Sequence, residues 1–191
     1  SLSIDSNNPT VQNNLAMLQL NRGNFKEGWK NFESRWLVDP RKSRFISTNK
    51  PLWSIGCSME NKVLIWGEEG IGDEIIYASM ISNENFNPKK TTICCTEKIK
   101  QLLKRSFPEF NVITFSEVKD DNFFDVHIRI GSLGQYLRSD IKEFKKQKER
   151  FLVTDVLRTK NFRQHIKSDK KYLCGLSWMS RAHKDKNCSL E

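Results

Sequence analysis

The sequence predicts an α/β fold with a mostly parallel sheet and helices on both faces, preceded by a pair of helices. After residue 61, short apolar runs alternate with stretches of helical period, which is the pattern of a doubly wound α/β domain. In residues 1–40, apolar residues recur only at helical spacing. The length of 191 residues allows one main core with a small additional element.

Residues 1–40 are expected to form a hairpin of two helices. The first covers 11–23, where Gly23 is suited to end the helix. The second covers 25–37 and carries an aromatic stripe at spacings of four, three and four residues, made of Phe25, Trp29, Phe32 and Trp36. Two helices cannot bury such a stripe alone, so we expect it to pack against the following domain.

A polar segment without clear period, 41–61, is expected to be a linker, and the α/β domain is expected over 62–171. The expected strands are 62–66, 91–95, 111–115, 124–130 and 151–153. The expected helices are 72–82, 97–106, 155–167 and a short one from Ser132. Residues 172–191, with a strand at 172–177, would close the sheet or begin a second half.

Composition and cysteine spacing argue against several classes of protein. No apolar run approaches the ~18 residues that span a bilayer, so we expect no membrane span. The first residues lack the basic and apolar parts of a secretory signal, and we expect a cytoplasmic location. The five cysteines form no C-x-x-C pair and none lies near a histidine at ligand spacing, so we expect no metal site.

The positive charge lies mainly in the last quarter of the chain. Residues 138–191 carry 15 of the 32 basic residues and only 7 of the 23 acidic ones. Such a region either attracts a phosphorylated ligand or is a solvated face. Its densest run, 142–150, contains one aromatic residue and no stacking series, so we expect no nucleic-acid partner.

A glycine-rich turn with four acidic residues, 67-GEEGIGDE-74, follows the first expected strand. A dinucleotide-binding loop has the spacing G-x-G-x-x-G, whereas this turn has G-x-x-G-x-G. Its carboxylates would also repel a pyrophosphate at the helix N-terminus. The turn is therefore a poor cradle for a nucleotide.

Two other interpretations of this turn stay open. In a structural one, Gly70 and Gly72 allow the turn. Asp73 then caps the helix and Glu74 meets the helix dipole, but Glu68 is left without a role. In a catalytic one, the turn presents a carboxylate at the C-terminal edge of the first strand, where open α/β sheets bind ligands. Neighbouring carboxylates would raise the pKa of that group, so that it could accept a proton from a substrate hydroxyl.

The N-terminal hairpin resembles one tetratricopeptide repeat. Seven residues fall at the repeat's positions in a single register: Leu15, Ala16, Gly23, Phe25, Gly28, Phe32 and Pro40. Arg35 stands where the repeat usually has alanine. The resemblance implies a terminal repeat, and an alternative function is a protein-interaction module that binds a partner through this hairpin without catalysis. One repeat offers little concave surface, because arrays usually need three or more.

The segment 51–73 resembles the entrance to the catalytic region of bacterial tetratricopeptide-repeat proteins with a glycosyltransferase domain related to the heptosyltransferases (glycosyltransferase family 9). Members show P-x-W-x-G, a strand and a G-E-x-G-x-G-D turn. The matching residues here are Pro51, Trp53, Gly56 (one residue late), Gly67, Glu68, Gly70, Gly72 and Asp73. Two further segments match the family: 125–138, with Gly134 in place of a proline, and 175–191.

This resemblance implies the GT-B architecture, in which two Rossmann-like halves face each other across a cleft. The N-terminal half receives a glycan or protein acceptor, and the C-terminal half binds the nucleotide-sugar, with no metal or other cofactor. The chain would then comprise one repeat, the acceptor-side half and the start of the donor-side half. We expect it to be inactive as a glycosyltransferase by itself, because the donor site is missing.

The resemblance also implies roles for individual residues. Asp73 would be the general base that deprotonates the acceptor hydroxyl in an inverting transfer. The acceptor-side loop around it would contain Glu68, Gly70 and Gly72. A later segment has the spacing of the family's T-x-R-x-x-K, and its residues Ser180, Arg181 and Lys184 are candidates to hold the donor phosphates.

Overall fold

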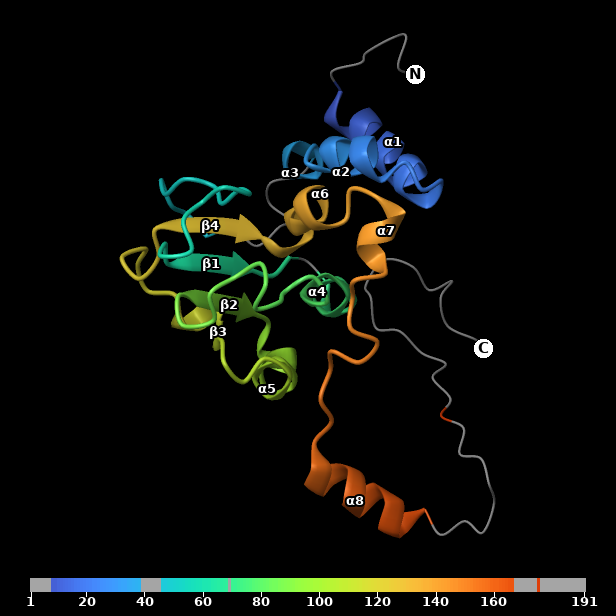
Figure 1. Ribbon diagram of the computed structural model, residues 1–191, viewed down its shortest axis with the longest axis vertical. Helices are drawn as coiled ribbons and strands as arrows, with labels where there is room; N and C mark the ends of the chain where they lie inside the picture. Colours follow the sequence, from blue (N-terminus) through green and yellow to red (C-terminus); the bar gives the residue numbers. More distant parts are fainter. Residues whose placement is uncertain (1–7, 39–45, 69, 167–174, 176–191) are drawn as a thin grey trace. The chain divides into compact units, whose positions relative to one another are not determined.

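The computed structural model describes residues 8–38, 46–68, 70–166 and 175. They form a mixed α/β structure with a four-stranded parallel sheet (Figure 1). The chain divides into two compact units, Ser1–Thr154 and Asp155–Glu191. In the described part of the chain, every helix is too short or too polar to cross a membrane.

The sheet contains the strands β1 (Val63–Trp66), β2 (Thr91–Cys95), β3 (Asn111–Thr114) and β4 (Val126–Arg129). Their spatial order is β3-β2-β1-β4, and every neighbouring pair is parallel (Figure 1). The chain therefore builds outward from β1 to β3 and then returns to the opposite side of β1. The direction of winding reverses between β1 and β4, and this reversal point is where open α/β sheets bind ligands.

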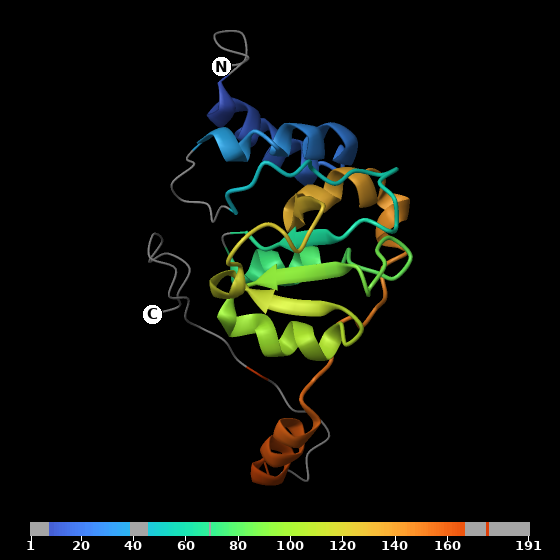
Figure 2. The same cartoon turned by 90° about the vertical axis from the view of Figure 1, so that its left-hand side faces the viewer.

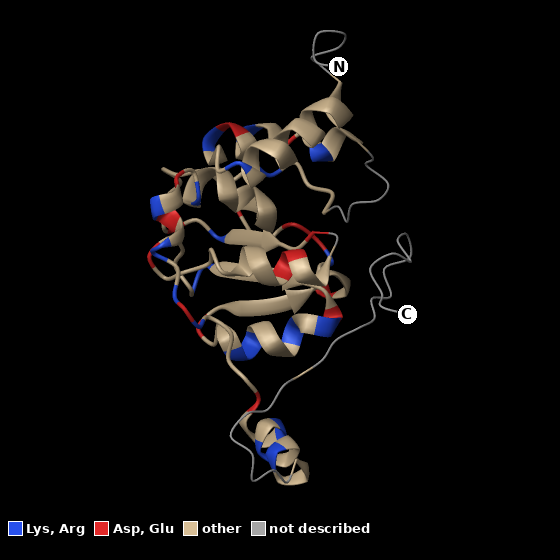
Figure 3. Ribbon diagram, turned by 90° about the vertical axis from the view of Figure 1, so that its right-hand side faces the viewer, with Lys and Arg blue, Asp and Glu red and all other residues tan. Residues whose placement is uncertain are grey.

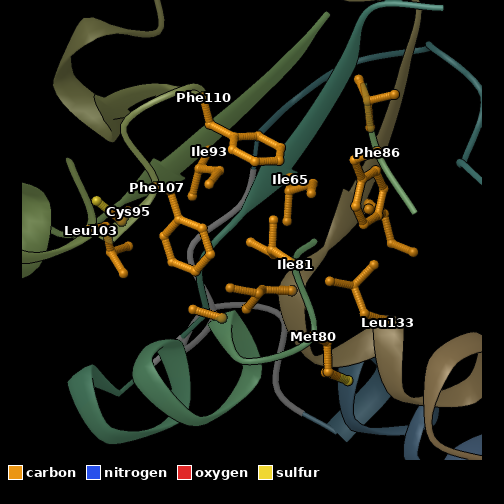
Figure 4. Close-up of a cluster of buried hydrophobic side chains, with 14 of the residues drawn as sticks. Ile65, Met80, Ile81, Phe86, Ile93, Cys95, Leu103, Phe107, Phe110 and Leu133 are labelled. Atoms are coloured by element: carbon orange, nitrogen blue, oxygen red, sulfur yellow. The ribbon is translucent and has the colours of Figure 1, made fainter. Parts of the chain in front are cut away.

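Helices α4 (Ile71–Ala78) and α5 (Glu97–Ser106) connect the first three strands and belong to the main apolar core. Helix α5 is amphipathic and buries Ile99 and Leu103. Figure 4 shows Leu103 near the strand residues Ile65 and Ile93, together with aromatic side chains from the following turns. This core fixes α4, and therefore the turn before it, against the sheet.

The other face of the sheet is covered differently from what the sequence suggested. A smaller cluster joins Leu64, Trp66 and Cys94 to Phe124 and to residue Ile46. The connection from β3 to β4 contains only the short 3-10 helix η1 (Phe115–Glu117). We expected helices on both faces, but the polar segment 118–122 has no apolar period that would make it a covering helix.

Among the described residues, three helices precede the sheet: α1 (Pro9–Asn21), α2 (Phe25–Phe32) and α3 (Arg35–Val38). Asn8 caps α1 by accepting hydrogen bonds from the N–H groups of the first turn, and Gly23 follows with φ +78°, a conformation that favours glycine. Gly28 lets α2 approach α1, because a Cβ there would lie 2.8 Å from Leu20. The single helix expected over 25–37 is interrupted after Phe32.

The aromatic stripe packs against the α/β part of the same unit, and this prediction is confirmed. Trp29 and Trp36 are buried. The Trp29 ring lies over Gly134, where a Cβ would be 2.5 Å from it, and its Nε1 donates to the carbonyl of Arg138 at 2.9 Å. Trp36 packs on Trp66 with ring centroids 6.1 Å apart. The N-terminal helices therefore pack directly against the α/β part, and Figure 2 shows them in blue beside α6.

After β4 the chain forms η2 (Ile130–Leu133), α6 (Gly134–Leu137) and α7 (Ile141–Phe144). The strand expected at 151–153 is not formed. Phe151 instead packs on Phe107, and the Val153 N–H donates to the Ser106 hydroxyl at 2.9 Å. These contacts hold the segment at the end of α5, so the apolar run serves packing rather than sheet pairing.

The second unit contains α8 (Val156–His165), which is capped by Asp155 through a hydrogen bond from the Arg158 N–H. Its apolar residues are exposed in the described structure. Figure 3 shows basic residues along this helix. The strand expected at 172–177 lies outside the described residues, apart from residue 175.

Candidate functional site

The candidate site lies at the carboxyl edge of β1 and β4, where the winding of the sheet reverses. Figure 3 shows acidic residues gathered where β1 passes into α4. The exits of the two strands touch directly, because the Gly131 N–H donates to Glu68 Oε1 at 2.8 Å. A Cβ on Gly131 would lie 2.6 Å from that oxygen and 3.1 Å from the Tyr77 ring. Glycine at this position therefore allows the turn to close on β4.

Glu68 forms a buried ion pair with Arg35 of α3. Arg35 Nη2 lies 2.8 Å from Glu68 Oε1, and Arg35 Nε donates to Oε2 at 3.1 Å, so the contact is bidentate. The side chains are only 11% and 7% exposed. Burial alone would lower the pKa of Arg35, but the hydrogen bonds and charge of Glu68 outweigh it and raise that pKa.

The rest of the Arg35 guanidinium is also satisfied. Nη1 donates to the Phe32 carbonyl and to Glu33 Oε1, each at 2.9 Å, and Nη2 donates to the Ser132 hydroxyl at 3.0 Å. That hydroxyl in turn donates to Glu33 at 2.7 Å. The guanidinium carbon lies 4.1 Å from the Phe32 ring centroid and 4.4 Å from that of Trp36. Arg35 therefore connects α3 to the edge of the sheet.

Glu74 is fully buried and joins β1 to the exit of β2. Its Oε2 accepts hydrogen bonds from the backbone N–H and the hydroxyl of Thr96, both at 3.0 Å. Gly67 leaves the space for this carboxylate, because a Cβ there would lie 2.5 Å from Oε1. Glu74 lies in the first turn of α4, as the structural interpretation requires. Its described hydrogen bonds go to Thr96, the residue before α5, so it fixes the start of that helix.

Asp73 also lies in the first turn of α4, and it is exposed. A Cβ on Gly70 would lie 2.6 Å from Asp73 Oδ2, so the carboxylate folds back over the turn. Gly70 is the N-cap, and the helix has no side-chain capping bond among the described residues. Partial desolvation raises the pKa of Asp73. Gly72 is exposed and has open space around it.

Two further groups of this edge were not expected from the sequence. Burial, Glu68 and Asp73 raise the pKa of Tyr77 to about 12. The guanidinium carbon of Arg129, at the end of β4, lies 3.8 Å from the Trp36 ring centroid, and burial lowers the pKa of this arginine. The only sequence signal for the ion pair between Arg35 and Glu68 was that Arg35 stands where a tetratricopeptide repeat usually has alanine.

The remaining predicted residues are placed as follows. Glu68, Gly70 and Asp73 lie together at the carboxyl edge of the sheet, between the end of β1 and the first turn of α4. Ser180, Arg181 and Lys184 lie outside the described residues. Within the part of the chain that the structure describes, no group of three or more histidine, cysteine or acidic side chains is placed to hold a metal ion.

No protein-family model, no curated protein and no solved structure matches this chain.

Proposed function

We propose that this chain supplies the acceptor-side half of an inverting glycosyltransferase, with Asp73 as the general base. In this mechanism Asp73 accepts the proton of an acceptor hydroxyl while that oxygen attacks the anomeric carbon of a nucleotide-sugar. The nucleoside diphosphate leaves from the opposite face of the sugar. No metal enters the step, because cationic side chains would balance the charge of the leaving diphosphate.

The observation that carries the proposal is the different engagement of the described carboxylates of the turn. Glu68 is held by Arg35 and Gly131, and Glu74 is held by Thr96. Asp73 is exposed and accepts no hydrogen bond from any described residue. Of these three side chains, it alone can receive a proton from a bound substrate.

The position and pKa of Asp73 also suit this role. It follows β1 at the carboxyl edge of the sheet, next to the reversal point. A general base works best when its pKa lies near the working pH, and desolvation moves the pKa of Asp73 upward, in that direction. The donor-side candidates Ser180, Arg181 and Lys184 would supply the diphosphate contacts, and they stay part of the proposal.

The alternative function, partner binding through the N-terminal hairpin, is supported less well. Its aromatic stripe is the surface best suited to bind a partner, but Trp29 and Trp36 are buried against residues of the α/β part. A partner would have to use the opposite face of α1, where Met17 and Leu18 are exposed.

The test offers a panel of nucleotide-sugars and acceptors to the chain joined to its donor-side half, and measures nucleoside diphosphate release. Asp73→Asn should lower kcat by about 10²–10⁴, the usual contribution of a general base. Glu97→Gln is the matched control, because Glu97 is also an exposed acidic residue in the first turn of a helix that follows a strand. Equal turnover by wild type and Asp73→Asn would remove Asp73 as the base.

A further inference from the structure

A cavity of about 320 Å³ lies at the far end of α4 from Asp73. It is bounded by the residues that follow α4, by the end of α6 and by the segment after α7. Helix α4 begins at the carboxyl edge of the sheet and ends beside this cavity. The cavity is therefore separate from the candidate active site and is not explained by the proposed transfer reaction.

Arg138 lines this cavity and is only 7% exposed. Its backbone is held on both sides: its N–H donates to the Gly134 carbonyl and its own carbonyl accepts from Trp29 Nε1, each at 2.9 Å. In the side chain, Nη1 donates to the Leu137 carbonyl at 2.7 Å. The guanidinium carbon lies 5.6 Å from the centroid of the Phe144 ring. The position of this charge is thus set by the core.

The guanidinium of Arg138 lacks a paired anion among the described residues. A buried charge is costly unless it is paired. A guanidinium has five N–H donors, and in Arg138 only Nη1 donates to a described residue. Burial lowers the pKa of Arg138, and the more distant charge of Glu143 opposes this only in part. Arg35, by contrast, has a carboxylate in place as its partner.

The rim of the cavity carries two lysines and two glutamates. Lys146 is paired with Glu143 at 2.8 Å, so these two charges largely cancel. Lys148 and Glu84 are exposed residues of the rim, and neither forms an ion pair with a described residue. The partly buried Phe151 provides an apolar wall beside them. The rim charges therefore balance, and the net positive charge of the cavity comes from Arg138, which lies beside an apolar surface.

We propose that this cavity binds the oxyanion group, phosphate or carboxylate, of a small molecule, with Arg138 as its anchor. The planar fork of arginine matches the two oxygens of either group, and such contacts are charge-assisted. A volume of about 320 Å³ is at the lower end of the range for small-molecule sites. Lys148 attracts the anion from the rim, and the apolar wall contacts the rest of the ligand.

The test titrates the chain with inorganic phosphate and, separately, with acetate at constant ionic strength, and follows the protein by NMR. At least one anion should cause saturable shifts of the Arg138 Nε–H and of the Ser82 and Lys148 amides. The stronger of the two identifies the ligand group as phosphate or carboxylate. Absence of saturable shifts with both anions overturns the proposal.

Variants make the test specific to the cavity. Arg138→Gln should abolish the shifts, and unchanged binding by the folded variant overturns the proposal. If Arg138→Gln does not fold, Lys148→Gln decides, because Lys148 is exposed and should weaken binding several-fold when replaced. Lys98→Gln is the control, since Lys98 is an exposed lysine on α5 that does not line the cavity. Equal affinity in Lys148→Gln and Lys98→Gln would contradict the proposal.

Discussion

Two buried carboxylates, Glu68 and Glu74, lie in the short stretch of chain that follows β1, and they connect this stretch to the strands on either side of β1. Glu68 reaches the exit of β4, and Glu74 reaches the exit of β2. Each depends on a glycine that leaves space for it, Gly131 for Glu68 and Gly67 for Glu74. The described partners differ, however, because Glu68 meets the cation of Arg35 whereas Glu74 meets the neutral N–H and hydroxyl of Thr96.

This difference shows two ways to stabilise a carboxylate at a sheet edge. An ion pair with good geometry brings a distant element to the site, and here it fixes α3. Hydrogen bonds from a neighbouring turn hold only the local connection. Asp73 lies between the two in sequence and has neither kind of partner among the described residues.

The largest expected effect comes from breaking the ion pair while keeping its shape. Glu68→Gln should lower the free energy of unfolding by about 3 kcal/mol, because it leaves the buried Arg35 with a partial partner in Glu33. Urea denaturation measures this loss. Glu143→Gln breaks the exposed pair with Lys146, and should cost less than about 1 kcal/mol. Similar losses in both variants would mean that the Arg35 pair does not hold the two elements together.

The second comparison uses two glycines of the same site. Gly131→Ala should cost about 1–3 kcal/mol, because the new methyl would meet Glu68 at 2.6 Å. Gly72→Ala should instead raise stability by up to about 1 kcal/mol, since Gly72 lies within α4 and has open space around it. Thermal denaturation of the two variants checks the opposite signs. A stabilising Gly131→Ala would show that the turn does not close tightly on β4.

A smaller effect is expected from Glu74→Gln, the isosteric counterpart of Glu68→Gln. The glutamine carbonyl can still accept from the Thr96 N–H and hydroxyl, so the loss should be about 1 kcal/mol. Urea denaturation beside Glu68→Gln gives the comparison directly. If Glu74→Gln were the more damaging change, the charge of Glu74 would matter more than its described hydrogen bonds explain.

The sequence predicted the elements whose signals are local. Strand β2 and helix α5 lie where expected, since an apolar run and an amphipathic period are each bounded by turn residues. The acidic turn was placed correctly between β1 and α4 for the same reason. The break after Phe32 was missed, because it depends on where the α/β part holds Arg35 and not on the helical period of the segment.

The contacts of the site could not be predicted, because they join residues far apart in the chain. Arg35 and Glu68 are 33 positions apart, and Glu33 and Ser132 are 99 apart. A single sequence carries no signal for such pairs. For the same reason Glu68 was left without a structural role, and Tyr77 and Arg129 were not recognised as part of the sheet edge.

The smallest expected effect concerns Asp73 and has the opposite sign from that of its neighbours. Desolvation raises the pKa of Asp73 above the ordinary 3.8, so the folded protein binds this proton more tightly than the unfolded chain does. Ionisation of Asp73 therefore lowers stability, and the penalty grows as pH rises from 3.8 through the folded pKa. Asp73→Asn should therefore raise stability at neutral pH. Well below pH 3.8 the carboxyl is protonated in both states, so the penalty is absent and the substitution has no such effect.

The measurement needs a control for the helix dipole, which favours any negative charge in a first turn. Glu97→Gln provides it, because Glu97 occupies the first turn of α5 and is exposed. At pH 7, Asp73→Asn should therefore be more stable than Glu97→Gln relative to the same wild type, and the difference should disappear in acid. If Asp73→Asn is the less stable variant at pH 7, its carboxylate stabilises the fold like those of Glu68 and Glu74, and a structural role in the first turn of α4 replaces the catalytic one.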